Sequence, residues 1–180
     1  YLVQEIPGVR VTLFKYPEGL ISVLESLNPE SAPHLVGFSN YVWNCSLSLG
    51  FAKAIKARFP SVVIVFGGPN LAYDSAEQEQ FLRHNPVIDF HVVKEGETAF
   101  CNLVRTLMAN DWDPASVSEK EINNLVFIDK NGSFRSSPRI DRVPLEILLS
   151  PYTSGLMDEF FDGKLYPIIQ TNRGCPFECT

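Results

Sequence analysis

Ser61-Val62-Val63-Ile64-Val65-Phe66-Gly67-Gly68-Pro69-Asn70 is the stretch of sequence that decides the fold. Its five consecutive β-branched or aromatic residues, with no polar alternation, predict a strand buried on both faces, as in a parallel sheet covered by helices. The strand runs directly into Gly-Gly-Pro, where the backbone can turn sharply without placing a side chain above the carboxyl edge of the sheet. Open α/β sheets bind ligands at that edge, although an ordinary turn that needs glycine explains the same residues.

Segments typical of strands and helices alternate on both sides of this stretch, which predicts a doubly wound, flavodoxin-like parallel sheet. Such a domain usually has five strands, and the sequence contains four, so we expect a first strand upstream of Tyr1. The predicted strands are Val9–Tyr16, His34–Ser39, Val62–Phe66 and Ile88–Val93, and the predicted helices begin at Pro17, follow Asn44, and cover Ser75–His84 and Thr98–Met108.

The composition limits the classes of protein to which this chain can belong. The 180 residues are 45% hydrophobic and 20% charged with a net charge of -6, values that fit a globular domain and disfavour a general nucleic-acid surface. No apolar run reaches about 18 residues and the chain does not open on a signal-like segment, so we expect no membrane span. The four cysteines have mixed spacing rather than a secreted disulfide framework, which favours the cytoplasm.

The pattern of alternating strands and helices ends near Asn110. Leu125–Phe134 contains Asn131-Gly132 and predicts a β-hairpin with a tight turn. Three prolines between Ser136 and Pro151 then predict an extended linker. The predicted domains are an α/β domain over 1–117, a hairpin and linker over 118–150, and the start of another domain over 151–180, with a strand at Tyr166–Thr171.

Cys175 and Cys179 follow this last strand in a loop. Two thiolates can ligate zinc or an iron–sulfur centre, but they do not complete a tetrahedral site, and a disulfide or two unrelated thiols explain the same pair. The segment from Arg173 to Thr180, Arg-Gly-Cys-Pro-Phe-Glu-Cys-Thr, resembles the opening of the radical S-adenosylmethionine (SAM) motif, CxxxCxxC. In that family three cysteines hold a 4Fe–4S cluster whose remaining iron binds adenosylmethionine. The resemblance implies that these are the first two ligands and that the third lies beyond the end of an N-terminal piece.

Upstream segments resemble the cobalamin-binding domain that precedes the barrel in one branch of these enzymes. The resemblance covers nearly the whole chain and departs from the family pattern at two positions. Asn70 stands for the histidine of a Gly-Gly-Pro-His loop, and Lys94 stands for the first glycine of a Gly-Glu-Gly-Glu signature. The similar segments are Gly37–Asn44, Phe66–Asn70, Val93–Phe100 and, as a bridge into the barrel, Ser150–Asp158.

The resemblance places the expected cobalamin contacts after three strands, at one edge of the sheet. A serine and an asparagine can hydrogen-bond the benzimidazole or the amides, the Gly-Gly-Pro turn offers bare backbone, and two aromatic rings offer apolar faces beside the corrin. Core packing is the alternative for the rings, and negative charge at a helix N-terminus is the alternative for the glutamates. The predicted contacts are Ser39, Asn40, Tyr41, Trp43, Gly67, Gly68, Pro69, Glu95, Gly96 and Glu97.

The three histidines, His34, His84 and His91, lie outside any Asp-x-His-x-x-Gly loop of the kind that presents a ligand to cobalt. Each is expected to be solvated or hydrogen-bonded rather than a ligand. Radical enzymes of this branch generally lack the cobalt-binding histidine, so its absence fits the resemblance.

The sequence therefore resembles the N-terminal part of a cobalamin-dependent radical SAM enzyme, with cobalamin, a 4Fe–4S cluster and adenosylmethionine as cofactors of the parent. The resemblance implies a deoxyadenosyl radical that abstracts hydrogen from a substrate, and methyl transfer to an unactivated carbon. This piece alone is expected to hold no cluster, to be inactive, and to self-associate through open strand edges. The alternative is a non-catalytic flavodoxin-like module for a ligand or partner, with Cys175 and Cys179 as a redox pair; no G-x-G-x-x-G or Walker loop supports nucleotide binding.

Overall fold

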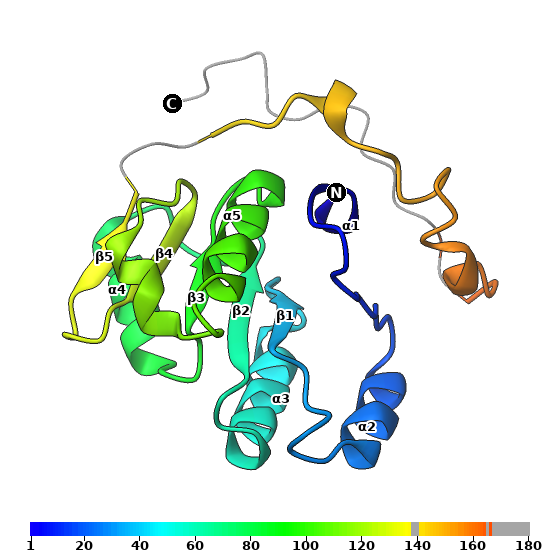
Figure 1. Ribbon diagram of the computed structural model, residues 1–180, viewed down its shortest axis with the longest axis horizontal. Helices are drawn as coiled ribbons and strands as arrows, with labels where there is room; N and C mark the ends of the chain where they lie inside the picture. The colour runs from blue at the N-terminus through cyan, green and yellow to red at the C-terminus, as the bar shows by residue number, and fades with distance from the viewer. Residues whose placement is uncertain (138–140, 165, 167–180) are drawn as a thin grey trace. The chain divides into compact units, whose positions relative to one another are not determined.

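The computed structural model describes residues 1–137, 141–164 and 166. The chain divides into two compact units, Leu2–Arg142 and the segment from Val143 onward. The first unit contains a sheet in the order β1-β2-β3-β4-β5 (Figure 1). Its strands are β1 Leu35–Ser39, β2 Val63–Gly67, β3 Phe90–Val92, β4 Leu125–Ile128 and β5 Phe134–Ser136, and its helices are α1 Leu2–Glu5, α2 Pro17–Ser26, α3 Cys45–Arg58, α4 Ser75–His84, α5 Glu97–Met108 and the 3-10 helix η1 Pro114–Glu119.

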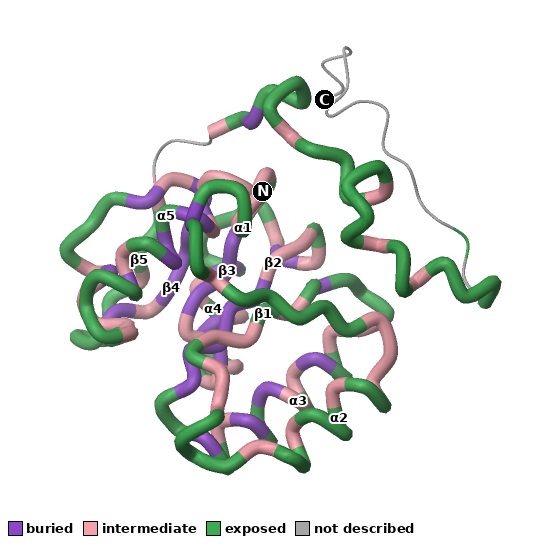
Figure 2. The backbone as a smooth tube through the Cα atoms, turned by 45° about the vertical axis from the view of Figure 1, so that its right-hand side comes forward, coloured by how far each residue is buried: buried purple, intermediate pink, exposed green. Residues whose placement is uncertain are grey.

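Strand β2 is the centre of the core, as its sequence predicts. Every residue from Val62 to Phe66 is at most 3% exposed. Alternate side chains point to opposite faces, so Val63 and Val65 pack in one cluster with α5 and η1, whereas Ile64 and Phe66 pack in another with α3 and α4. Figure 2 shows the buried stretches in the sheet and on the helices beside it. The doubly wound class is therefore confirmed.

The parallel part of the sheet is smaller than predicted. Strands β1, β2 and β3 are parallel, but Val9–Tyr16, the expected additional strand, forms no helix or strand. Three of its apolar side chains are exposed, Val11 at 43%, Leu13 at 37% and Phe14 at 40%. A strand needs a hydrogen-bonding neighbour, and among the described residues β1 pairs only with β2. The prediction of four parallel strands was therefore wrong by one.

The predicted hairpin is present and extends the same sheet. Strand β4 pairs antiparallel with β3 on one side and with β5 on the other. Gly132 turns between them at φ +78°, and Asp129 accepts hydrogen bonds from the Ser133 amide and from Arg135. Both hydrogen bonds hold the pKa of the Asp129 carboxyl below its usual value, and the bond from Ser133 has the larger effect. The hairpin therefore belongs to the unit that ends at Arg142.

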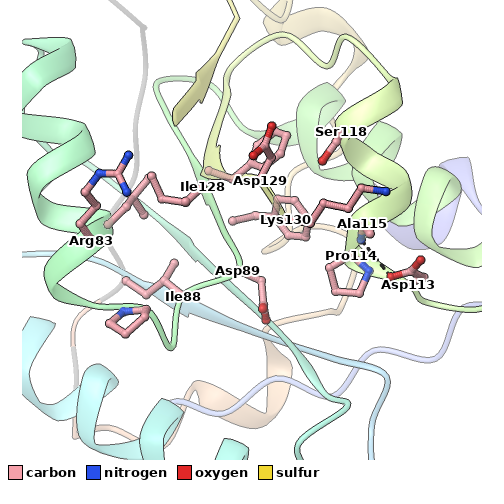
Figure 3. A pocket seen from close by; sticks show the side chains of 14 residues that line it. Arg83, Ile88, Asp89, Asp113, Pro114, Ala115, Ser118, Ile128, Asp129 and Lys130 are labelled. Carbon is pink, nitrogen blue, oxygen red and sulfur yellow. Dashed lines mark hydrogen bonds between the residues drawn. The ribbon is translucent and has the colours of Figure 1, made fainter. Parts of the chain in front are cut away.

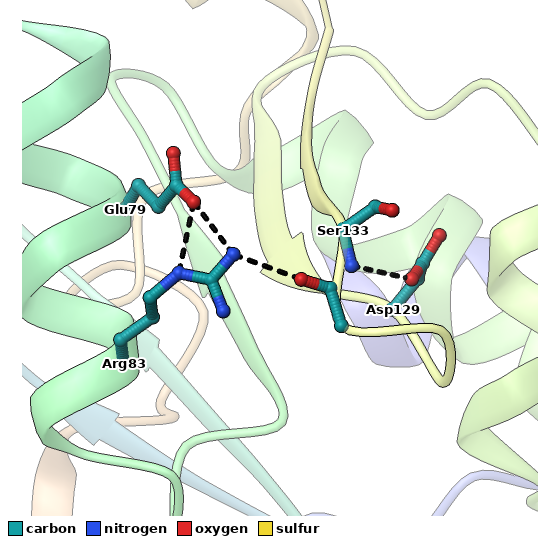
Figure 4. A network of polar contacts seen from close by, with 5 residues as sticks. Glu79, Arg83, Asp129 and Ser133 are labelled. Atoms are coloured by element: carbon teal, nitrogen blue, oxygen red, sulfur yellow. Dashed lines mark hydrogen bonds and ion pairs between the residues drawn. The ribbon is translucent and has the colours of Figure 1, made fainter.

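Helix α4 is tied to this hairpin by a polar network (Figure 4). Arg83 forms an ion pair with Glu79, one turn earlier, at 2.6 Å. The same guanidinium donates to the Gly132 carbonyl at 2.8 Å. The turn is thus fastened to the helix that covers one face of the sheet.

The second unit contains two short 3-10 helices in its described part, η2 Leu145–Ile147 and η3 Asp158–Phe160. The rings of Tyr152 and Phe161 are in contact in a tilted arrangement, with centroids 5.9 Å apart and planes 46° apart. Apart from Tyr166, which is 96% exposed, the predicted strand Tyr166–Thr171 lies outside the described residues. The domain limits at 117 and 150 stay predictions.

Candidate functional site at the carboxyl edge of the sheet

Three loops meet where the parallel strands end. Ser39 lies opposite Gly67 in the β1–β2 register, and Gly67 lies opposite Val92 in the β2–β3 register. The Asn40 amide donates to the Gly67 carbonyl at 2.7 Å, so the first two loops remain in contact beyond the strands. The predicted gathering of these segments at one edge is present in the structure.

The loop after β1 presents an exposed aromatic pair. Tyr41 and Trp43 stack with centroids 4.6 Å apart and ring planes 15° apart, and they are 36% and 79% exposed. Asn44 fixes this loop, because its Oδ1 accepts from the Tyr41 amide and its Nδ2 donates to Ser39 Oγ, both at 2.8 Å. Core packing therefore does not explain these two rings; they form a flat apolar surface facing solvent.

The loop after β2 requires glycine at one position. Gly68 has φ +134°, and a Cβ placed there would lie 2.6 Å from the Asn40 carbonyl oxygen. That oxygen also accepts from the Asn70 amide at 3.2 Å. Gly67 is less restricted, since a Cβ there would meet Val92 at 3.7 Å. The double glycine thus lets two backbones touch and leaves the exposed Pro69 turn without bulky side chains.

Asn40 is fully buried, with 0% exposure. Its Nδ2 lies 3.1 Å from Nε2 of His91, and its Oδ1 accepts from Asn70 Nδ2 at 3.2 Å. The side chain of Asn40, one of the predicted cobalamin contacts, therefore forms its hydrogen bonds inside the protein. His91, which sequence reasoning left without a role, is also 0% exposed; burial lowers its pKa from 6.5 to about 4, and a weaker contact with the Val92 backbone acts in the opposite direction.

The loop after β3 contains the Glu95-Gly96-Glu97 segment. Gly96 is the N-cap of α5 and Glu97 is its first residue, a position where negative charge suits the helix dipole. A Cβ on Gly96 would approach Val92 Cγ1 to 3.1 Å. Lys94, in place of the family glycine, adopts φ +58°, which explains why glycine suits the position.

Three residues that the sequence did not single out shape this edge. Asn44 fixes the aromatic loop, as described above. Tyr73, 83% exposed, lies under the Lys94 ammonium, which is 3.6 Å from the ring centroid. Asn124, 2% exposed, donates to the Glu95 carbonyl at 2.8 Å. Only Asn44 had a local signal, because asparagine before a helix is a common N-cap.

Replacing Asn124 by glycine is expected to destabilise the first unit by about 2 kcal/mol. The side chain bonds Glu95 and both backbone groups of Asp141, and glycine keeps the positive φ of 60° while removing those bonds. Urea denaturation followed by circular dichroism measures the change. Asn131→Gly in the hairpin turn is the control and should change stability by less than about 0.5 kcal/mol; equal effects of the two substitutions would contradict the assignment.

The predicted metal ligands Cys175 and Cys179 lie outside the described residues. Within the described ranges, no group of three or more histidine, cysteine, aspartate or glutamate residues is arranged to hold a metal ion. Cys45 and Cys101 are free thiols, and burial raises the pKa of Cys101, as expected for a structural cysteine.

A separate cavity of about 510 Å³ lies at the opposite, amino edge of the sheet, between α4, η1 and the hairpin (Figure 3). The carboxylates around it serve the fold. Asp89 accepts from the Ile64 amide at 2.6 Å and pairs with Lys56 at 2.7 Å, and Asp113 caps η1. Because these carboxylates are engaged in the fold, and Ser118 Oγ is the one lining hydroxyl that is buried without a partner among the described residues, the cavity is a weaker candidate than the carboxyl edge.

The family of the chain follows from comparison with known proteins. Residues 5–104, more than half of the chain, match the B12 binding domain family. The chain belongs to this family, and its exposed aromatic pair and bare glycine turn lie at the edge where open α/β sheets bind ligands.

Two relatives of the chain are methyltransferases. The chain is 29% identical over 174 residues, 93% of its length, to the cobalamin-dependent radical SAM methyltransferase TokK of Streptomyces tokunonensis. It is 31% identical over 153 residues, 82% of its length, to the 2-(S-pantetheinyl)-carbapenam-3-carboxylate methyltransferase of Streptantibioticus cattleyicolor. These matches cover 24% and 21% of the two relatives, so the chain spans about a quarter of their length.

A more distant relative is the anaerobic magnesium-protoporphyrin IX monomethyl ester cyclase of Synechocystis, at 28% identity over 133 residues, which are 69% of this chain and 24% of that protein. In the part of the chain that the structure describes, no helix has the length and apolar character needed to cross a membrane.

Proposed function

We propose that this chain binds cobalamin at the carboxyl edge of β1, β2 and β3, as part of a cobalamin-dependent radical SAM methyltransferase. The observation that carries the proposal is the stacked, exposed pair of Tyr41 and Trp43 beside the glycine turn at Gly67 and Gly68. A flat apolar surface suits a corrin ring, and bare backbone allows close approach of a nucleotide tail.

Each loop has a distinct task in this proposal. The aromatic pair contacts the corrin, Ser39 and the turn through Pro69 line the slot for the tail, and Glu95, Gly96 and Glu97 close the third side. Cobalamin, when bound, supplies a cobalt-carried methyl group. The residues of this chain bind it, orient it and shield one side from water.

The rest of the proposal concerns the parent enzyme and rests on the relatives and on the cysteine motif. Cys175 and Cys179 would provide two ligands of a 4Fe–4S cluster, adenosylmethionine would be the source of the radical, and the substrate would bind outside this chain. Such an oxygen-sensitive centre suits the cytoplasm. The alternative of a redox module gains no support from the described residues, because both cysteines of the pair lie outside them.

Titration with hydroxocobalamin tests the proposal. We expect one cobalamin per chain, measured by equilibrium dialysis, with quenching of tryptophan fluorescence by the corrin. Trp43→Ala should weaken binding at least tenfold, since an aromatic contact contributes about 0.5–1.5 kcal/mol beyond its buried area. The fluorescence of Trp43 should account for most of the quenching.

Tyr166→Ala is the matched control, because Tyr166 is an aromatic residue that is at least as accessible as Trp43, 96% against 79% exposed, and takes no part in the proposed site. The Tyr166→Ala variant should bind hydroxocobalamin with the same affinity as the unmodified chain. No binding by the unmodified chain, or equal loss in both variants, would refute the proposed site.

A further inference from the structure

We infer that Asn40 and His91 are positioning residues: their buried hydrogen bond fixes His91 as the neutral tautomer with its proton on Nδ1 and holds the loops after β1 and β2 in one geometry. The inference rests on the proposed cobalamin site for its functional meaning, but its structural part can be tested without a cofactor.

The tautomer follows from the partners of the Asn40 amide. Oδ1 of Asn40 accepts from Asn70 Nδ2 at 3.2 Å, which leaves the NH2 group to face Nε2 of His91 at 3.1 Å. In this orientation of the Asn40 and Asn70 amides the NH2 group can only donate, so Nε2 carries the lone pair. The ring proton is therefore on Nδ1, which is buried without a hydrogen-bond partner among the described residues.

The network connects all three parallel strands. Asn40 follows β1, Asn70 lies in the loop after β2, and His91 belongs to β3. The Asn40 backbone adds two bonds, donating to Gly67 and accepting from Asn70. Because Tyr41 is the next residue, the placement of Asn40 also sets where the aromatic pair begins.

The surroundings of His91 do not require a polar side chain for packing. The edge of its ring faces Phe81 of α4, with centroids 6.4 Å apart, so an apolar ring would fit the same surroundings. Burying polar groups is costly unless they are bonded, yet Nδ1 of His91 forms no hydrogen bond of ordinary geometry among the described residues, and the contact of the ring with the Val92 backbone offsets only part of the effect of burial on the His91 pKa. A geometric role at the base of the site accounts for keeping histidine there.

Imidazole nitrogen NMR on the uniformly 15N-labelled chain tests the tautomer directly. We expect a pyridine-like signal from Nε2 of His91 and a pyrrole-like signal from Nδ1 at neutral pH, assigned by the disappearance of both in His91→Gln. The exposed His34 and His84 are internal references. A proton on Nε2, or a charged ring at neutral pH, would overturn the inference.

Amide hydrogen exchange tests the loop geometry without cobalamin. Asn40→Ala and His91→Phe should each speed exchange of the Asn40 and Asn70 amides at least tenfold relative to amides inside β2. In His91→Gln, whose side-chain carbonyl can accept from Asn40, the rate should stay within threefold of the unmodified chain. Unchanged exchange in both Asn40→Ala and His91→Phe would exclude the positioning role.

Hydroxocobalamin affinity then links the geometry to function. Among variants that circular dichroism shows to be folded, Asn40→Ala and His91→Phe should bind at least tenfold more weakly, and His91→Gln within threefold of the unmodified chain. Full affinity in His91→Phe would overturn the functional part. Failure of the unmodified chain to bind would instead refute the proposed function, while the exchange measurement would still decide whether Asn40 and His91 hold the loops.

Discussion

Replacing Gly68 by alanine is expected to destabilise the chain by about 3 kcal/mol or more and to abolish hydroxocobalamin binding. The glycine has φ +134°, a conformation that costs an L-residue about 1–3 kcal/mol. The added Cβ would also lie 2.6 Å from the Asn40 carbonyl oxygen, and relieving such a contact by backbone shifts costs about another 1–3 kcal/mol. Urea denaturation gives the stability change.

The neighbouring Gly67 offers a matched control. Its Cβ would meet only ordinary contacts, at 3.7 Å from Val92, and its φ is not positive. Gly67→Ala should therefore change stability by less than about 1 kcal/mol. If both substitutions had the same effect, the contact between the backbones at Asn40 and Gly68 would not be the cause.

Acidification from pH 6.5 to 4 is expected to destabilise the native chain through His91 by about 3 kcal/mol. Burial lowers the pKa of His91 to about 4 from an ordinary value of 6.5. Below pH 6.5 the unfolded chain therefore binds a proton that the native chain does not, so stability falls as the pH falls. The loss levels off below about pH 4, where the native state also takes up the proton.

Comparison with His91→Gln isolates this contribution. The two proteins are identical at every other position, so the difference between their unfolding free energies, measured in urea from pH 7.5 to 4, belongs to His91. As the pH falls, we expect the unfolding free energy of the unmodified chain to decrease more than that of His91→Gln. A difference independent of pH would show that the buried ring is not the neutral group that the structure implies.

The sequence predicted the central strand β2 correctly, but it wrongly predicted an additional parallel strand at Val9–Tyr16. Val62–Phe66 is apolar on both sides of the strand, so its burial follows from composition alone. Val9–Tyr16 alternates apolar and polar residues over Val9–Leu13, as a half-exposed strand does, but a strand depends on a partner elsewhere in the sheet, and none of the described segments pairs with it. Local periodicity contains no information on that partner.

At the candidate site, the location was predictable and the division of roles was not. Strand ends in sequence place the three loops at one edge, because parallel strands share direction. Ser39 and Asn40 are neighbours with similar chemistry, yet one is exposed and the other fully buried. What separates them is His91, 51 residues away in sequence, a contact that only the folded chain reveals.

The two margins of the sheet differ in a way that limits how copies of the chain could join. Strand β5 is three residues long and includes Arg135, paired with Asp129; short, charged edges resist pairing. Strand β1, Leu-Val-Gly-Phe-Ser, has no charge. If two copies joined through β1, the edges left unpaired among the strands that the structure describes would be the two β5 strands. Growth would then stop at a pair, so association of this chain is expected to produce dimers rather than fibres.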